Sequence, residues 1–420
     1  MTKIKKLCIT SLIGILFVQG IGKAPLVKAD VIKDVNGYID SNTGDIVEDV
    51  EDEIRYEKER YYIDDFETIE AYLKYCKENG FTDELINEIW LGGNPDTTIS
   101  PARMYQINNL PSTRAIQNFY VGSQYVYVTQ HMGNGNVRIS RCTITGSGTA
   151  TYKDYMTLTG VGHGATLERY TYNSKEYFLV TAKSNETING DGKTVYYSLQ
   201  VGRVEYKANT TLDNLNIARF CNLNYANKAN TRFADVERVN AAITTSADKI
   251  LLWVRSSNNT IQYSIYDFNT FNSELDKVDG SSYLAYFSNN TTMKNACEYS
   301  VVQTSSNCVL PNGSFQGIDI ANLGNTGKHA IYIASGNQNS GKELVIARVR
   351  YDVGSSLTYM ENVGITFSEE NNEDENNEDE NNEIEGIHVI NSSTLYIGIA
   401  KHNADGSKIN YIYSIPRSSV

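Results

Sequence analysis

The sequence predicts an all-β chain folded as a five-bladed β-propeller, closed by an N-terminal outer strand and preceded by a short acidic helical segment. Three observations support this prediction. A short motif recurs five times, each copy is followed by two further runs of alternating apolar residues, and loops rich in Asn and Gly separate these runs. The composition agrees, since 40% of the 420 residues are apolar and only 6 are Pro.

The first 29 residues have the three parts of a secretory signal peptide. Three lysines supply a positive start, residues 7–20 form an apolar stretch too short to span a bilayer, and residues 27–29 offer a small-residue cleavage site. No second apolar run of transmembrane length follows. We therefore expect a secreted, extracellular protein without a stable membrane span, whose mature form begins at Asp30.

Residues 30–101 are predicted to be an acidic, partly helical segment. Residues 30–100 contain 20 acidic and 6 basic side chains. One helical face is indicated by apolar residues that are alternately four and three positions apart, namely Tyr62, Phe66, Ile69, Leu73 and Cys76. This segment is a propeptide, a targeting module or a cap on the main domain, or else a pair of solvated helices packed against that domain.

The recurring motif consists of an apolar residue, a Gln or Glu, any residue and a second apolar residue. Its five polar positions are Gln117, Glu168, Glu237, Gln316 and Glu385. After each motif we predict a second strand, at residues 125–130, 177–181, 250–255, 330–335 and 395–400. A third strand follows at residues 137–144, 197–206, 261–268, 344–351 and 409–415. The uneven spacing of the motifs indicates insertions of different length in a repeated three-strand core.

A fourth strand can be assigned in most repeats, for example at residues 155–160 and 357–363. The fifth repeat ends at Val420 without one, whereas the segment 104–110 before the first repeat has no other partner. If this segment supplies the missing outer strand, the ring closes and the edges of its sheets are protected. Residues 102–420 are therefore assigned to the propeller, with a β-sandwich or an irregular β-fold as the alternative.

The stretch 369–385 is predicted to be a disordered acidic loop between the fourth and fifth blades. It holds ten acidic residues and no basic ones, in a repeat of Glu, Asn and Asp. Such a run repels itself and has almost nothing to bury. It also lacks the glycine-centred spacing of an EF-hand calcium loop.

The first strands of a propeller surround its central channel, so the five polar motif side chains are predicted to form a ligand-binding ring. Three carboxylates and two carboxamides that face one axis can hold a cation or hydrogen-bond a sugar. The alternative is architectural, with each side chain bonded to the backbone of its own blade.

No catalytic motif is present. A glycosidase needs two carboxyl groups that flank the scissile bond, and Asp319, Glu168, Glu237 and Glu385 are the available first-strand carboxylates, but the first repeat contributes none. His163 lies between two glycines without the partners of a hydrolase motif.

The cysteines do not indicate a metal centre. The five that remain after signal removal form no C-x-x-C pair, so neither a metal site nor a cofactor is predicted. Cys297 and Cys308 either form a disulfide or remain buried thiols.

The net charge of −13 argues against a nucleic-acid partner, because phosphate binding requires clustered Lys and Arg. Outside the first 100 residues and the acidic loop, however, basic side chains outnumber acidic ones by 26 to 20. The chain also holds 30 Tyr. A mildly basic, tyrosine-rich ring suits an anionic, sugar-containing polymer, since tyrosine rings stack on sugars.

Several stretches resemble the helveticin J family of class III, large heat-labile bacteriocins, among them AIQNFYVGSQYVYVTQ, GHGATLE, QVGRVEYKA, NLNYANKAN and VLPNGSFQGIDI. The resemblance covers roughly residues 104–420. It implies an antibacterial protein that binds a cell-envelope polymer or glycan of Gram-positive bacteria and kills or lyses the cells. No catalytic residue is carried over from the family, and the signal peptide, the acidic segment and the acidic loop are departures from its pattern. A non-lytic surface lectin or adhesin and a cell-wall or glycan hydrolase are the alternative functions.

Overall fold

The computed structural model describes residues 97–146, 148–188, 194–257, 260–303, 315–323, 329–338, 342–351, 357–367 and 381–420. Within these residues the chain is mostly β-structure, which confirms the predicted class. The predicted signal peptide, the predicted helices and most of the acidic loop lie outside the described residues.

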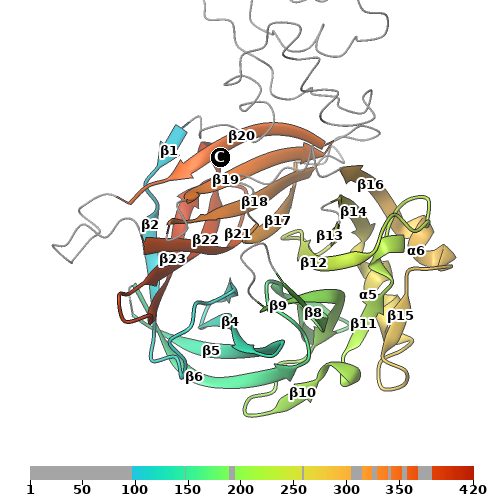
Figure 1. The fold of residues 1–420 in the computed structure, drawn as a ribbon, viewed down its shortest axis with the longest axis horizontal. Helices are drawn as coiled ribbons and strands as arrows, with labels where there is room; N and C mark the ends of the chain where they lie inside the picture. The colour runs from blue at the N-terminus through green and yellow to red at the C-terminus, as the bar shows by residue number, and fades with distance from the viewer. Residues whose placement is uncertain are drawn as a thin grey trace, which may run out of the picture.

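The strands form five successive antiparallel units of four strands each (Figure 1). The first contains β3 (Asn118–Val121), β4 (Tyr125–Gly133), β5 (Asn136–Gly146) and β6 (Gly148–Thr159). The second contains β7 (Leu167–Tyr172), β8 (Lys175–Ile188), β9 (Thr194–Val204) and β11 (Ala218–Cys221). The third contains β12 (Val236–Ile243), β13 (Lys249–Ser256), β14 (Ile261–Asp267) and β16 (Cys297–Gln303).

The last two units complete the arrangement. The fourth contains β17 (Gly317–Asn322), β18 (His329–Asn337), β19 (Lys342–Tyr351) and β20 (Leu357–Ile365). The fifth contains β21 (Asn382–Val389), β22 (Thr394–His402), β23 (Lys408–Pro416) and β2 (Ala102–Asn108). In Figure 1 the units surround a common centre, with their first strands innermost.

Strand β2 links the two ends of the chain. It pairs antiparallel with β23 of the fifth unit and parallel with β6 of the first unit. The segment 104–110, predicted to supply the missing outer strand, thus contributes most of β2.

Two strands extend into segments predicted to be non-β. β1 (Thr97–Ile99) lies in the segment predicted to be acidic and partly helical, yet it pairs parallel with β20 at the outer edge of the fourth unit. Residues 382–385, assigned to the disordered loop, instead begin β21. In both cases backbone pairing with an existing sheet outweighs the local composition.

An insertion between β14 and β16 was not predicted. It contains α5 (Phe268–Asp276), β15 (Leu284–Tyr286) and α6 (Thr291–Ala296). The side chain of Asp267 caps α5 by accepting a hydrogen bond of 2.7 Å from the backbone of Thr270. The minor elements of the described chain are β10 (Thr211–Asp213), which pairs with β6, and the 3-10 helices Asn214–Asn216, Leu223–Tyr225 and Arg417–Ser419.

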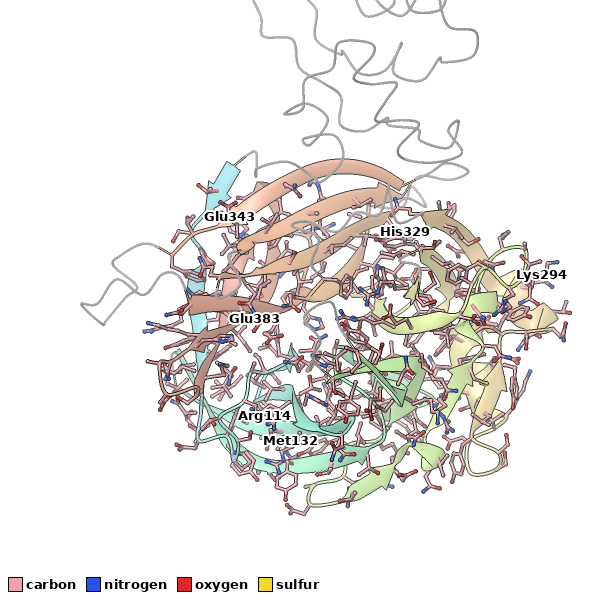
Figure 2. The ribbon with its side chains drawn as sticks, in the orientation of Figure 1. Arg114, Met132, Lys294, His329, Glu343 and Glu383 are labelled. Atoms are coloured by element: carbon pink, nitrogen blue, oxygen red, sulfur yellow. The ribbon has the colours of Figure 1, made fainter. Side chains whose placement is uncertain are left out.

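The apolar core is divided into five clusters, and each cluster lies between two successive units. Alternate residues of one strand serve opposite clusters, so Leu252 of β13 packs toward the second unit and Trp253 toward the fourth. One cluster joins the fifth unit to the first, through Ile107 and Ile412 on one side and Val128 on the other. Side chains fill the space between the units (Figure 2).

Candidate functional site

The five polar motif side chains do not converge on one point. Nε2 of Gln117 donates to Oε1 of Glu385 at 3.3 Å, which joins the first and fifth units. Gln316 donates instead to Glu383, at 2.8 Å. The other carboxylate oxygen of Glu383 lies 2.9 Å from Nε2 of His402.

The remaining two motif side chains have separate surroundings. Glu237 forms an ion pair of 3.2 Å with Arg255 of the neighbouring strand. Glu168 lies in a buried cluster of its own. The predicted ring is therefore divided into one pair that spans two units, two side chains with other partners, and one buried carboxylate.

Strand bulges account for the different directions of the three glutamates. The register of β12 shifts at Glu237 and that of β21 shifts at Glu385, so each of these residues is the extra one of a β-bulge. β7 pairs with β8 without a shift, and Glu168 lies directly opposite Leu179. Because a shift of one residue turns a side chain to the other face of the sheet, equivalent motif positions point in different directions.

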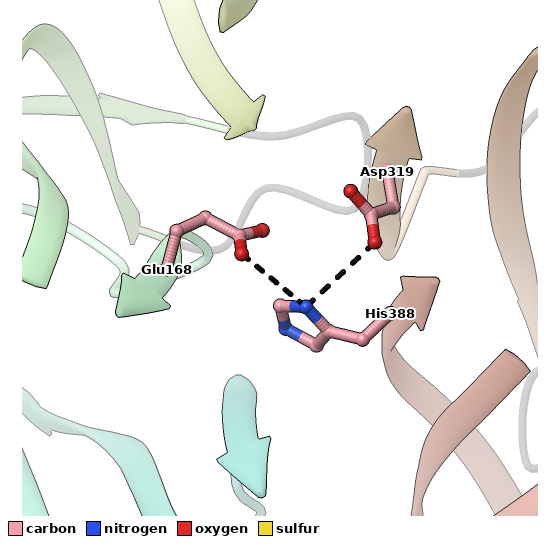
Figure 3. Close-up of side chains that lie close together, drawn as sticks. All are labelled: Glu168, Asp319 and His388. Carbon is pink, nitrogen blue, oxygen red and sulfur yellow. Dashed lines mark ion pairs between the residues drawn. The ribbon is translucent and has the colours of Figure 1, made fainter. Parts of the chain in front are cut away.

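Glu168, Asp319 and His388 meet in the interior (Figure 3). Nδ1 of His388 lies 3.4 Å from Oε2 of Glu168 and 3.8 Å from Oδ2 of Asp319. The three ligand atoms lie within 4.8 Å of one another. The side chains are only 8%, 3% and 6% exposed. They come from β7, β17 and β21, so the cluster joins the second, fourth and fifth units.

Two glycines allow β17 and β21 to come close enough for this contact. A Cβ atom on Gly317 would lie 2.9 Å from Cα of Gly386, nearer than real Cβ atoms approach. Asp319 and His388 each follow one of these glycines by two positions, on the same face of their strands. The close approach of the backbones thus places the carboxylate beside the imidazole.

Asn118 of β3 fixes the orientation of the imidazole. Its Oδ1 lies 2.8 Å from Nε2 of His388 and accepts the backbone N–H of Phe119 at 2.7 Å. Its Nδ2 donates to the carbonyl of Ala165 at 2.7 Å. These backbone bonds determine which end of the amide faces the ring, so Nε2 of His388 carries a proton. Nδ1 is then the ring atom that faces both carboxylates.

The two carboxylates favour a positive charge at Nδ1 of His388. Burial raises the pKa of Asp319 well above its usual range, and the Glu168 carboxylate raises it further. Burial alone would lower the pKa of His388, but Glu168 and Asp319 outweigh it and raise this pKa to about 9. Two backbone N–H groups, of Ile320 and Val389, also donate to Asp319. The arrangement is suited to holding a cation, either a proton on the imidazole or a metal ion.

The same cluster is poorly suited to cutting a glycan. The two carboxyl groups of a glycosidase must flank a sugar bond, whereas both carboxylates here are screened from solvent. The sequence pattern identifies Glu168 and Asp319 as candidate carboxylates, but it does not identify Asn118 or His388. A signal was available, since Asp319 and His388 both stand four residues after the apolar residue that opens their motif.

A second group of polar side chains is called the Tyr125 surface, defined as Tyr125, Arg141 and Lys153 of the first unit and Tyr206, which follows β9 of the second unit. The exposed Lys153 donates to the hydroxyl of Tyr125 at 3.0 Å and lies 4.8 Å from the centre of its ring. The guanidinium of Arg141 lies 5.0 Å from the Tyr125 ring and 5.2 Å from the Tyr206 ring. Arg141 is held in place by a two-bond contact with Asp154. Aromatic faces and cations are thus combined in one surface.

His163 and the described cysteines are packed in the interior of the protein. His163 stacks on His131 at 5.2 Å, and burial, together with the nearby charge of Arg238, lowers its pKa to about 3. It is therefore neutral at physiological pH. The described cysteines are free and buried, namely Cys142, Cys221 and Cys297. Cys308, the other half of the possible disulfide, lies outside the described residues. In the described part of the chain, no helix has both the length and the apolar character needed to cross a membrane.

Comparison with known proteins gives one family. The family model described as bacteriocin helveticin-J matches residues 96–418. No curated protein matches significantly.

Solved structures show only a distant likeness. A GH43 endo-arabinanase from Bacillus licheniformis is 10% identical, with 76% of this chain and 96% of that chain covered and a TM-score of 0.36. The catalytic domain of a GH62 alpha-L-arabinofuranosidase from Coprinopsis cinerea is 8% identical, with 76% and 98% covered and a TM-score of 0.37. TM-scores this low do not establish a common fold.

Proposed function

Since the chain belongs to the helveticin-J bacteriocin family, we propose that it is a secreted antibacterial protein that binds the envelope of Gram-positive bacteria and kills or lyses them. The family match carries this proposal, because it spans nearly all of the described residues. The signal-peptide pattern of residues 1–29 supports secretion.

The proposed architecture is a five-bladed β-propeller in which the five units are the blades. Their circular order and the apolar cluster between each successive pair support it. Strand β2 supports closure, since it pairs with both the fifth and the first unit. A ring of this kind presents a rigid surface to a large partner.

The proposed partner is an anionic, sugar-containing envelope polymer such as teichoic acid. We place the contact on the Tyr125 surface, where tyrosine faces can stack on sugars and Lys153 can pair with phosphate. The motif side chains are less suitable, because Glu237, Gln117 and Gln316 are partly buried, whereas Lys153 is exposed.

The test measures bound protein and viable count in the same tubes, with purified protein and a panel of Gram-positive cells. The variant Tyr125→Ala/Lys153→Gln should reduce binding at least about tenfold, which corresponds to about 1.4 kcal/mol. The control is Lys294→Gln, which removes an exposed lysine from α6, well away from the first unit (Figure 2). This control should bind like the unaltered protein.

The outcomes separate the candidate functions. Binding with loss of viability supports the bacteriocin proposal, and binding with full survival favours a lectin or adhesin. Release of reducing sugar ends would identify a glycan hydrolase. Unchanged binding to cells stripped of teichoic acid would refute the proposed polymer.

A further inference from the structure

We propose that the cluster of Glu168, Asp319 and His388 binds a divalent transition-metal ion, zinc or manganese, that joins the second, fourth and fifth units. The sequence predicts no such site, because the three residues are far apart along the chain and follow no metal-binding spacing. The inference concerns the stability of the ring and does not depend on the proposed function.

The distances between the three ligand atoms are compatible with one shared ion. Nδ1 of His388 lies 3.4 Å and 3.8 Å from the carboxylate oxygens of Glu168 and Asp319. Hydrogen bonds from N–H to oxygen measure about 2.7–3.2 Å. Ligand atoms that are each about 2.0–2.2 Å from one tetrahedral ion are separated by roughly 3.3–3.6 Å. The three ligand atoms lie within 4.8 Å of one another, so a movement of about 1 Å by the carboxylates would complete the geometry.

The surroundings of the ligands are those of a metal site. A metal-binding imidazole generally donates its other N–H to a fixed acceptor, and Nε2 of His388 faces Oδ1 of Asn118. That amide is itself held by backbone groups of Phe119 and Ala165. Backbone N–H groups hold the Asp319 carboxylate as well. The imidazole and this carboxylate are therefore oriented before any ion binds.

A divalent ion can balance the charge of the two carboxylates. Two carboxylates that are 3% and 8% exposed are costly to bury without compensation. A divalent cation with a neutral imidazole leaves the centre without net charge. The nitrogen ligand favours zinc and the two carboxylates also suit manganese, whereas calcium and magnesium prefer oxygen ligands alone.

The experiment uses the full chain, unfolded in denaturant with EDTA and refolded after removal of both. Zinc, manganese, calcium or magnesium is then added singly, and bound metal is measured by elemental analysis alongside the thermal midpoint. We expect one equivalent of zinc or manganese per chain and a midpoint raised by several degrees, since a ligand that binds only the folded state stabilises it.

Variants distinguish this site from accidental binding. Glu168→Gln keeps the size of the side chain and removes one ligand charge, so we expect loss of the bound ion and of the rise in midpoint. The matched control is Glu237→Gln, which changes a carboxylate at the same motif position of β12 and should retain both. Far-UV circular dichroism checks folding, and His388→Gln replaces Glu168→Gln if that variant does not fold.

Three results would overturn the proposal. One is a folded chain that takes up no stoichiometric zinc or manganese. Another is Glu168→Gln that binds the ion as tightly as the unaltered chain. The third is stabilisation by calcium or magnesium alone, which would exclude a site built around the His388 nitrogen.

Discussion

The connection between the two ends of the chain can be tested by truncating one side chain of β2. Ile107 is 5% exposed and lies in the apolar cluster between the fifth and first units. Ile107→Ala removes three buried carbons, worth about 2.4 kcal/mol at about 0.8 kcal/mol each. The residual cavity adds about 1 kcal/mol. We therefore expect the free energy of unfolding to fall by about 3–4 kcal/mol.

Ile99→Ala is the matched control. Ile99 belongs to β1, which flanks the outer edge of the fourth unit, and it is only half-buried beside the cluster between the fourth and fifth units. Its truncation should cost about 1 kcal/mol. Both values are obtained from urea denaturation followed by intrinsic fluorescence. Equal losses in the two variants would refute the reasoning, because β2 would then contribute no more than a peripheral strand.

Three further predictions concern buried groups. Burial and the nearby Glu383 raise the pKa of Glu385 well above its usual range. Glu385 therefore stabilises the folded state below about pH 4.5, and this contribution to the free energy of unfolding is lost as the pH rises through the folded-state pKa. Glu385→Gln should therefore increase stability by about 1–2 kcal/mol at pH 8 and leave it unchanged at pH 4, whereas a pH-independent effect in urea titrations would contradict this. Gly317→Ala should lower the free energy of unfolding by about 1–3 kcal/mol in the same assay, because its Cβ would collide with the backbone of Gly386. An unchanged free energy would show that β17 and β21 can move apart. Burial raises the pKa of the Cys142 thiol to about 12, so mass spectrometry should find it unmodified by iodoacetamide in the native chain and modified in urea.

The strands were largely predictable because alternation and repetition are local properties of the sequence. The predicted strand 250–255 lies within β13 and the predicted strand 395–400 lies within β22. The pairing of the segment 104–110 with the fifth repeat was also predictable, because that repeat is the one without a fourth strand of its own. The insertion with α5 was missed, because it replaces a short connection in one repeat only and has no counterpart in the others.

The site was less predictable because side-chain direction depends on single-residue shifts. Glu168 and Glu385 occupy the same motif position, but the bulge at Glu385 turns it away from the direction taken by Glu168. Hydrophobic patterning does not reveal a bulge of this kind. The buried cluster also depends on a close approach of two strands at Gly317, which follows from tertiary packing rather than from local preference.

The position of β2 also determines when the fifth and first units can be joined. Ala102 lies opposite Ser414, 312 residues further along the chain. Strand β2 is therefore synthesised long before β23, the strand with which it pairs. Until β23 is available, β2 can pair only with β6, and the first and fifth units each keep an open edge. Contacts of such large sequence separation form slowly. A nascent chain therefore cannot join its first and fifth units through β2 until β23 is made, and a chain that stops before residue 408 never joins them in this way.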